Sequence, residues 1–174
     1  MNNIKLTIVF VCFLVFFTPA LLSLGIRFLP GNQMPETGGS RKVYIGNTLN
    51  FEVKNPDKNL VGVVVRVKNS IRANVNLTLQ LFDGNDQVVV ESVVNGLSIL
   101  DGSEVRFSFS LSTLKGGSLQ GIFTSDAIEQ NAMEIYLERD SNSSAYVLLY
   151  KPASRLGLIG GIYSGWLKHL FGVK

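Results

Sequence analysis

The chain has 174 residues, a net charge of +3, one cysteine and one histidine, and its length allows one domain with a hydrophobic core. Basic charge gathers at the two ends, whereas residues 43–151 hold nine basic and twelve acidic side chains, so we expect no nucleic-acid binding. Cys12 lies in an apolar run and His169 in the C-terminal tail, which excludes a disulfide framework, a cysteine-based metal site and a histidine-activated nucleophile from the segment between them.

An uncharged, apolar run covers residues 6–26. With about 1.5 Å of rise per helical residue, a run of this length reaches roughly 30 Å, the thickness of the hydrocarbon core of a bilayer. Residues 1–26 are therefore predicted to form a transmembrane anchor or uncleaved signal. A cleaved secretory signal is the alternative, because Ser23 and Gly25 form a weak small-x-small site. The short preceding tail favours a single-pass protein of the cell membrane with an extracytoplasmic domain.

Residues 27–42 are rich in glycine and proline and are predicted to be a flexible linker. Residues 43–151 then alternate apolar and polar side chains with the period of two that a half-buried strand requires. Predicted strands cover residues 49–53, 60–68, 75–81, 87–94, 105–111, 119–124, 132–138 and 145–151. The pattern predicts an all-β fold, an antiparallel two-sheet β-sandwich that is jelly-roll-like and has eight or nine strands.

Four short motifs give residues 43–151 a resemblance to a known family. The motifs are the opening strand from Asn47 to Val53, the segment Asn59-Leu60-Val61-Gly62-Val63, the pair Arg72-x-Asn74, and the strand with Phe107 and Phe109. The segment resembles the jelly-roll β-sandwich modules attached to bacterial membrane glycosyltransferases and related envelope-polysaccharide proteins. The resemblance implies contact with envelope glycan. No enzyme domain with many spans is attached, so a catalytic partner, a membrane glycosyltransferase, is expected to be a separate chain.

The candidate ligand-binding residues that follow from this resemblance are Arg72, Asn74 and Tyr136. Sugar sites commonly combine aromatic rings with planar polar groups, and these residues supply both. A simpler interpretation stays open, in which the aromatic side chain packs on a sheet and the Arg72 and Asn74 side chains fix a loop by hydrogen bonds.

Carboxylates offer two further candidate sites. Glu134 and Glu138 fall on one face of a predicted strand, as an acid–base pair would require. Asp83, Asn85 and Asp86 bring calcium-type oxygen ligands into one turn. We interpret the strand carboxylates as solvated charges and the others as turn formers. We therefore expect no catalytic residue, no cofactor and no metal.

The tail, residues 152–174, is apolar and basic and is predicted to form a short amphipathic helix. Its expected place is the interface of a lipid bilayer. The residues expected at that interface are Arg155, Tyr163, Trp166 and Lys168. The residues spaced for close helix packing are Gly157, Gly161 and Gly165. Two alternatives stay open: packing against a partner protein, and a loose tail, since glycine weakens an isolated helix.

The leading functional hypothesis is a non-enzymatic, membrane-tethered module that acts by binding, in the assembly of envelope glycan or protein. The alternative is a structural subunit of a surface assembly, pilus-like, whose apolar N-terminal helix packs with copies of itself. Against this alternative, the run lacks the acidic residue near its start that pilin-type packing usually employs.

Overall fold

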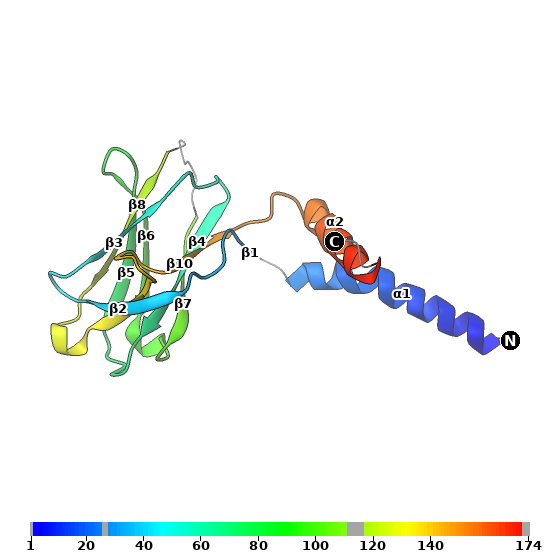
Figure 1. Cartoon of the computed structure of the whole chain (residues 1–174), viewed down its shortest axis with the longest axis horizontal. Helices are drawn as coiled ribbons and strands as arrows, with labels where there is room; N and C mark the ends of the chain where they lie inside the picture. The colour runs from blue at the N-terminus through cyan, green and yellow to red at the C-terminus, as the bar shows by residue number, and fades with distance from the viewer. Residues whose placement is uncertain (1, 26–27, 111–116, 172–174) are drawn as a thin grey trace. The chain divides into compact units, whose positions relative to one another are not determined.

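The segments with alternating apolar residues form two antiparallel sheets that enclose one core (Figure 1). The structure is a computed structural model that describes residues 2–25, 28–110 and 117–171. The larger sheet contains β1 (Leu29–Pro30), β2 (Thr37–Val43), β4 (Leu60–Lys68), β7 (Ser103–Ser108), β9 (Met133–Glu138) and β10 (Tyr146–Tyr150). The smaller sheet contains β3 (Leu49–Val53), β5 (Asn76–Phe82), β6 (Val88–Asn95) and β8 (Leu119–Ser125).

The strand order of the larger sheet is β1-β10-β4-β9-β2, with β7 also paired to β4, and that of the smaller sheet is β3-β8-β5-β6. Two short 3₁₀ helices, η1 (Gly96–Ser98) and η2 (Glu129–Asn131), lie in connections between strands. The predicted all-β fold, an antiparallel two-sheet sandwich, is confirmed. It has 10 strands, more than the eight or nine predicted.

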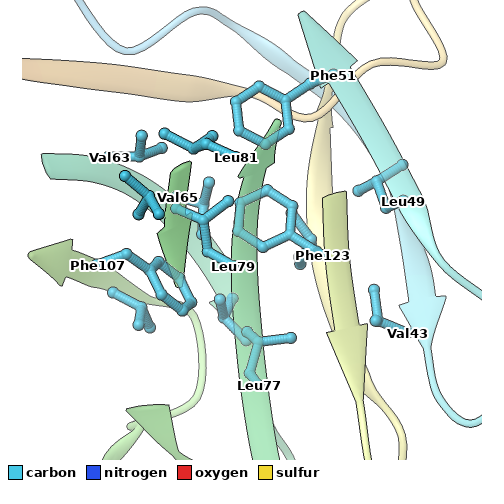
Figure 2. Close-up of a cluster of buried hydrophobic side chains, with 14 of the residues drawn as sticks. Val43, Leu49, Phe51, Val63, Val65, Leu77, Leu79, Leu81, Phe107 and Phe123 are labelled. Atoms are coloured by element: carbon cyan, nitrogen blue, oxygen red, sulfur yellow. The ribbon is translucent and has the colours of Figure 1, made fainter. Parts of the chain in front are cut away.

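The core fills the space between the two sheets, as the sequence alternation predicts. Along β5, Leu77, Leu79 and Leu81 are fully buried. The ring centroids of Phe107 on the larger sheet and Phe123 on the smaller sheet lie 5.5 Å apart, and Phe123 also stacks on Phe51 of its own sheet at 5.1 Å. Figure 2 shows these rings among the aliphatic side chains. Such packing of large apolar groups is the main favourable term that holds a sandwich of this size together.

The structure places β1 and β2 in the segment that the sequence predicts to be a flexible linker. β2 pairs with β9 from Thr37 opposite Glu138 to Val43 opposite Met133, with an irregularity after Thr37. β2 ends the strand order of its sheet. Edge strands tolerate the glycine and proline that otherwise indicate a linker, which explains the two additional strands.

The N-terminal run forms α1 (Asn2–Gly25), and the tail forms α2 (Arg155–Phe171), as a helix was predicted there. These helices belong to a unit separate from Pro30–Tyr150. In the described part of the chain, no helix is both long enough and apolar enough to cross a membrane. The predicted transmembrane helix and the single-pass localisation at the cell membrane are therefore wrong. The prediction relied on the length and the uncharged, apolar composition of residues 6–26.

Candidate functional site

The candidate site lies beside a hairpin that projects between β9 and β10. Both strands pair antiparallel with β4 and therefore run in the same direction. The chain between them leaves the sheet after β9 and returns to it at β10. Residues 137–144 make this excursion, which we call the β9–β10 hairpin. The Glu138 N–H donates a hydrogen bond to the Ser143 carbonyl oxygen (3.0 Å), and Leu137 and Ser144 form an antiparallel bridge. The hairpin therefore presents polar groups at the edge of the larger sheet.

Opposite the hairpin, the sheet edge is interrupted between β1 and β2, and a side chain replaces the strand backbone. The Asn32 Nδ2 atom donates to the Tyr146 carbonyl oxygen (2.8 Å), and the Asn32 Oδ1 atom accepts from the Leu148 N–H (2.9 Å). An asparagine amide has the donor and the acceptor that a backbone peptide offers. Asn32 thus holds its segment against β10 without a regular strand.

Two open hollows form along this interruption. The large hollow has a volume of about 620 Å³ and is lined by residues 37–39 and 137–142. The small hollow has a volume of about 280 Å³ and is lined by Asn32, Gln33, Pro35, Glu138, Ser144 and Tyr146. Glu138 lines both, so the hollows adjoin, and we call them together the polar cleft. The large hollow falls within the range of about 300–1,000 Å³ that is usual for ligand pockets.

Glu36 and Arg139 fix the two walls of the cleft against each other. Their side chains form an ion pair, and the Arg139 N–H donates to the Glu36 carbonyl oxygen (2.7 Å). A Cβ atom at Gly38 would lie 2.9 Å from the Arg139 Cα, so the absence of a side chain there permits the close approach. The ion pair is exposed and adds little stability by itself, but the backbone hydrogen bond and the packing define the separation of the walls.

Tyr146 forms a fixed, uncharged wall of the small hollow. Its hydroxyl donates to the Glu52 carbonyl oxygen (2.7 Å), and its ring centroid lies 4.9 Å from that of Phe51. Burial raises the pKa of Tyr146 above 10.0, and the nearby carboxylates of Glu138 and Glu52 add to the rise. The phenol therefore stays neutral at physiological pH.

Ser144 is the unusual residue of the small hollow. Only 1% of its surface is exposed, and among the described residues its Oγ atom has no hydrogen-bond partner. A buried hydroxyl without a partner costs about 1–3 kcal/mol relative to a hydrogen-bonded one. The structure thus retains an unfavourable polar group at the wall of a polar hollow.

Two of the three predicted glycan-binding residues lie in one loop, and the third lies on a strand of the larger sheet. Arg72 lies in the loop between β4 and β5 with φ +51°, and its Nη2 atom donates to the Leu97 carbonyl oxygen (3.0 Å). Asn74 Oδ1 in the same loop accepts from Asn95 Nδ2 (2.9 Å). Both side chains therefore fix the loop, as the simpler interpretation from the sequence has it.

Tyr136 lies on β9, opposite Ser40 of β2, and is half-buried. This position is on the larger sheet and not in the loop that holds Arg72 and Asn74. A contact of any of the three residues with a glycan stays a prediction.

Two of the carboxylates that the sequence offers for catalysis or metal binding, Glu134 and Asp83, make structural contacts. Glu134 accepts a hydrogen bond from the Ser40 hydroxyl and lies 3.5 Å from Lys68 Nζ. These interactions, the Ser40 hydrogen bond first, lower the pKa of Glu134 below 4.5. Asp83 Oδ1 accepts from the backbone N–H groups of Asn85 (2.9 Å) and Gln87 (3.0 Å), as a turn former does.

On α2, Arg155 and Trp166 are exposed and Tyr163 is half-buried. A Cβ atom at Gly161 would meet nothing within 4 Å in the described structure, and one at Gly157 would meet the Ser154 hydroxyl at 2.8 Å. The side chain of Lys168 and the surroundings of Gly165 lie outside what the structure describes. The interfacial and helix-packing roles of these residues stay predictions.

The sequence gives no direct indication of the polar cleft. The relevant signal is the distance along the chain between two predicted strands: residues 139–144 are more than a tight turn requires, and most of them are polar or charged. Loops of this kind, held on a rigid scaffold, commonly carry binding residues.

No protein-family model matches the chain. A search of curated proteins also gives no match.

Solved structures give distant likenesses. Xylanase10C from Cellvibrio japonicus in complex with xylopentaose is 9% identical with a TM-score of 0.45, and the match covers 72% of this chain and 29% of that one. A carbohydrate-binding module, CBM36, in complex with calcium and xylotriose is 12% identical with a TM-score of 0.37, covering 71% and 99%. The infectious bursal disease virus VP2 subviral particle is 10% identical with a TM-score of 0.39, covering 76% and 34%. At these TM-scores the likenesses support no conclusion about a ligand, and they do not show the expected link to membrane glycosyltransferases.

Proposed function

We propose that the sandwich is a non-catalytic binding module that takes a glycan in the polar cleft. The observation that carries the proposal is the pair of adjoining hollows that share Glu138 at the edge of a rigid sheet. Glycans are rich in hydroxyl groups, each of which donates and accepts hydrogen bonds. The side chains of Thr37, Asp140 and Asn142 line the large hollow and offer matching donors and acceptors.

The residues of the sandwich favour binding over catalysis, because those considered for catalysis are unsuited to it. The described residues that line the cleft include no histidine, so they offer no imidazole to activate a nucleophile. Glu134, one member of the carboxylate pair that the sequence offers, has a lowered pKa and is held by Ser40 and Lys68. A general acid needs a raised pKa, which makes Glu134 unsuited to that role.

A blocking substitution tests this proposal. Gly39 lines the large hollow, and a Cβ atom there would meet nothing within 4 Å. The Cβ atom of Gly39→Tyr therefore has room, and we expect the aromatic side chain to occupy the hollow and to reduce glycan binding by at least about tenfold, which corresponds to about 1.4 kcal/mol. The measurement is binding of the full-length chain to an array of immobilised neutral and acidic glycans, followed by isothermal titration with the best ligand.

Gly84→Tyr is the matched control. Gly84 lies in the turn between β5 and β6, where a Cβ atom also has open space, and it does not line the cleft. The control should bind as the wild-type chain does. Wild-type protein that binds no glycan, or equal binding by Gly39→Tyr and the wild-type chain, would sink the proposal.

A role in envelope glycan assembly, beside a separate glycosyltransferase, is the finer form of this proposal. The pilus-like alternative is favoured by one observation, the exposed apolar side chains of Leu6, Val9, Phe10 and Phe13 on α1. Affinity purification of the full-length chain from its own cells separates the two, because co-purification of a glycosyltransferase supports the first. A homopolymer seen by light scattering, which a charged Phe10→Glu variant no longer forms, supports the second.

A further inference from the structure

We infer that the small hollow is a subsite for one hydroxyl group of a neutral glycan, which accepts a hydrogen bond from Ser144 and donates one to Glu138. This inference rests on the proposed function and names the class of glycan. It follows from the hydrogen-bonding groups of the hollow, of which two are placed to act on a ligand.

Ser144 provides the first group. The residue lines the hollow, and its hydroxyl is buried and has no partner in the described part of the chain. Two of the polar side chains around it are occupied, since Asn32 bonds the backbone of β10 through both amide atoms and the Tyr146 hydroxyl bonds the Glu52 carbonyl oxygen. A donor that the protein leaves unpartnered at the wall of a hollow requires an acceptor from outside.

Glu138 provides the second group. It lines both hollows, and its carboxylate acts on the Tyr146 phenol, so it lies close to the wall of the small hollow. An ionised carboxylate only accepts hydrogen bonds. A ligand hydroxyl fits both residues, because it can accept from the Ser144 hydroxyl and donate to the Glu138 carboxylate, whereas a ligand carboxylate has nothing to donate to Glu138.

The charges of the cleft favour a neutral glycan over an acidic one. Three charged side chains line it: Glu138, Arg139 and Asp140. Arg139 is already paired with Glu36 of the opposite wall. Glu138 and Asp140 add two further carboxylates to the lining of the cleft, and these repel a negatively charged ligand. Uronic-acid and phosphorylated glycans are thus expected to bind more weakly than their neutral counterparts.

Ser144→Ala in the full-length chain tests the subsite. The probes are matched neutral and uronic-acid oligosaccharides, including mannotriose and trimannuronic acid, on the array and then in titration. We expect the wild-type chain to prefer the neutral members, and Ser144→Ala to bind them roughly tenfold more weakly, the effect of one hydrogen bond. The thermal midpoint of the free variant should stay the same or rise, because the substitution removes an unpartnered buried hydroxyl. Ser108 is an exposed serine on β7, and Ser108→Ala should change neither the glycan affinity nor the thermal midpoint.

Glu138→Gln provides an independent readout. The amide keeps the shape of the side chain and removes its charge, so the preference for neutral over uronic-acid glycans should fall. Equal affinities of Ser144→Ala and the wild-type chain would show that water serves the hydroxyl and would overturn the inference, as would acidic glycans bound as tightly as neutral ones. Either result leaves the proposed function intact, which fails only if no glycan binds or if Gly39→Tyr has no effect.

Discussion

At the scale of single residues, the core depends on a close approach between Phe51 and Gly121. The two residues lie opposite each other on β3 and β8, and a Cβ atom at Gly121 would overlap the Phe51 ring. An aromatic side chain that covers a glycine on the neighbouring strand compensates for the missing side chain and fixes the register. The Phe51 ring in turn contacts Phe123 and Tyr146, so the glycine supports the whole aromatic cluster.

Gly121→Ala should therefore destabilise the protein. The added methyl group forces the Phe51 ring out of its position, and overpacking of this kind costs about 1–3 kcal/mol. The free energy of unfolding in urea measures the effect. Gly84→Ala, at a turn with open space, is the control and should change it by less than about 0.5 kcal/mol. Equal values for the two variants would show that the ring adapts freely.

Single residues also mark the limit of what the sequence predicts. The alternation of Leu77, Leu79 and Leu81 predicts their burial correctly, because a strand with one buried face imposes a period of two. Ser144 has no such pattern. Its burial depends on how the β9–β10 hairpin folds back against the sheet, which the local sequence does not specify. Whether its hydroxyl finds a hydrogen-bond partner depends on which residues from distant parts of the chain pack around it.

At the scale of elements, Glu134 joins three strands of the larger sheet. It lies on β9, accepts from Ser40 on β2 and pairs with Lys68 on β4. Both partners favour the ionised carboxylate, and the Ser40 hydroxyl has the larger effect on its pKa. The stability of this part of the sheet is therefore linked to the protonation of one group.

As the pH falls into the acid range, the wild-type chain should lose stability more steeply than a variant that lacks the Glu134 carboxylate. A carboxyl with a lowered pKa stabilises the folded state above its ordinary value of 4.5, and this contribution is lost as the pH falls through the lowered value. Urea unfolding at pH 6 and pH 3 should show a smaller difference for Glu134→Gln and for Ser40→Ala than for the wild-type chain. Ser108→Ala should behave as the wild-type chain does. An unchanged difference in Glu134→Gln would contradict the assignment.

The strands β1 and β2 show what the sequence of an element leaves open. Pro30, Gly38 and Gly39 are typical of a linker, and the segment has no clear alternation. It becomes a strand because β9 offers an unpaired edge, so the determining groups lie in another element. The other eight strands, by contrast, lie in segments that the sequence itself predicts to be strands.

At the scale of the whole molecule, the sandwich unit Pro30–Tyr150 extends beyond the β-sandwich domain predicted at residues 43–151. Composition and alternation correctly predict the fold class and a helix at each end. The membrane span was inferred from the length of an uncharged, apolar run and is wrong, since no helix of the described residues meets the requirement for crossing. The polar cleft could not be predicted because one of its walls, residues 32–39, lies in the segment assigned to the linker.

Shortened chains test where the sandwich begins. Residues 30–150 should unfold cooperatively, whereas residues 43–150 should be less stable by at least about 2 kcal/mol, because several hydrogen bonds between β2 and β9 are lost. Thermal and urea unfolding of both chains measure the difference. Identical unfolding of the two chains would show that β2 does not contribute to the stability of the sandwich.

The Asn32 amide has a further consequence for the behaviour of the folded chain in concentrated solution. A long, regular edge strand offers a continuous row of backbone donors and acceptors to which another molecule can add a strand. Here the edge is divided into the short β1 and the longer β2, and between them a side chain takes up the backbone groups of Tyr146 and Leu148. The interruption that opens a cleft for a ligand also limits edge-to-edge pairing between the larger sheets of two molecules, and therefore aggregation.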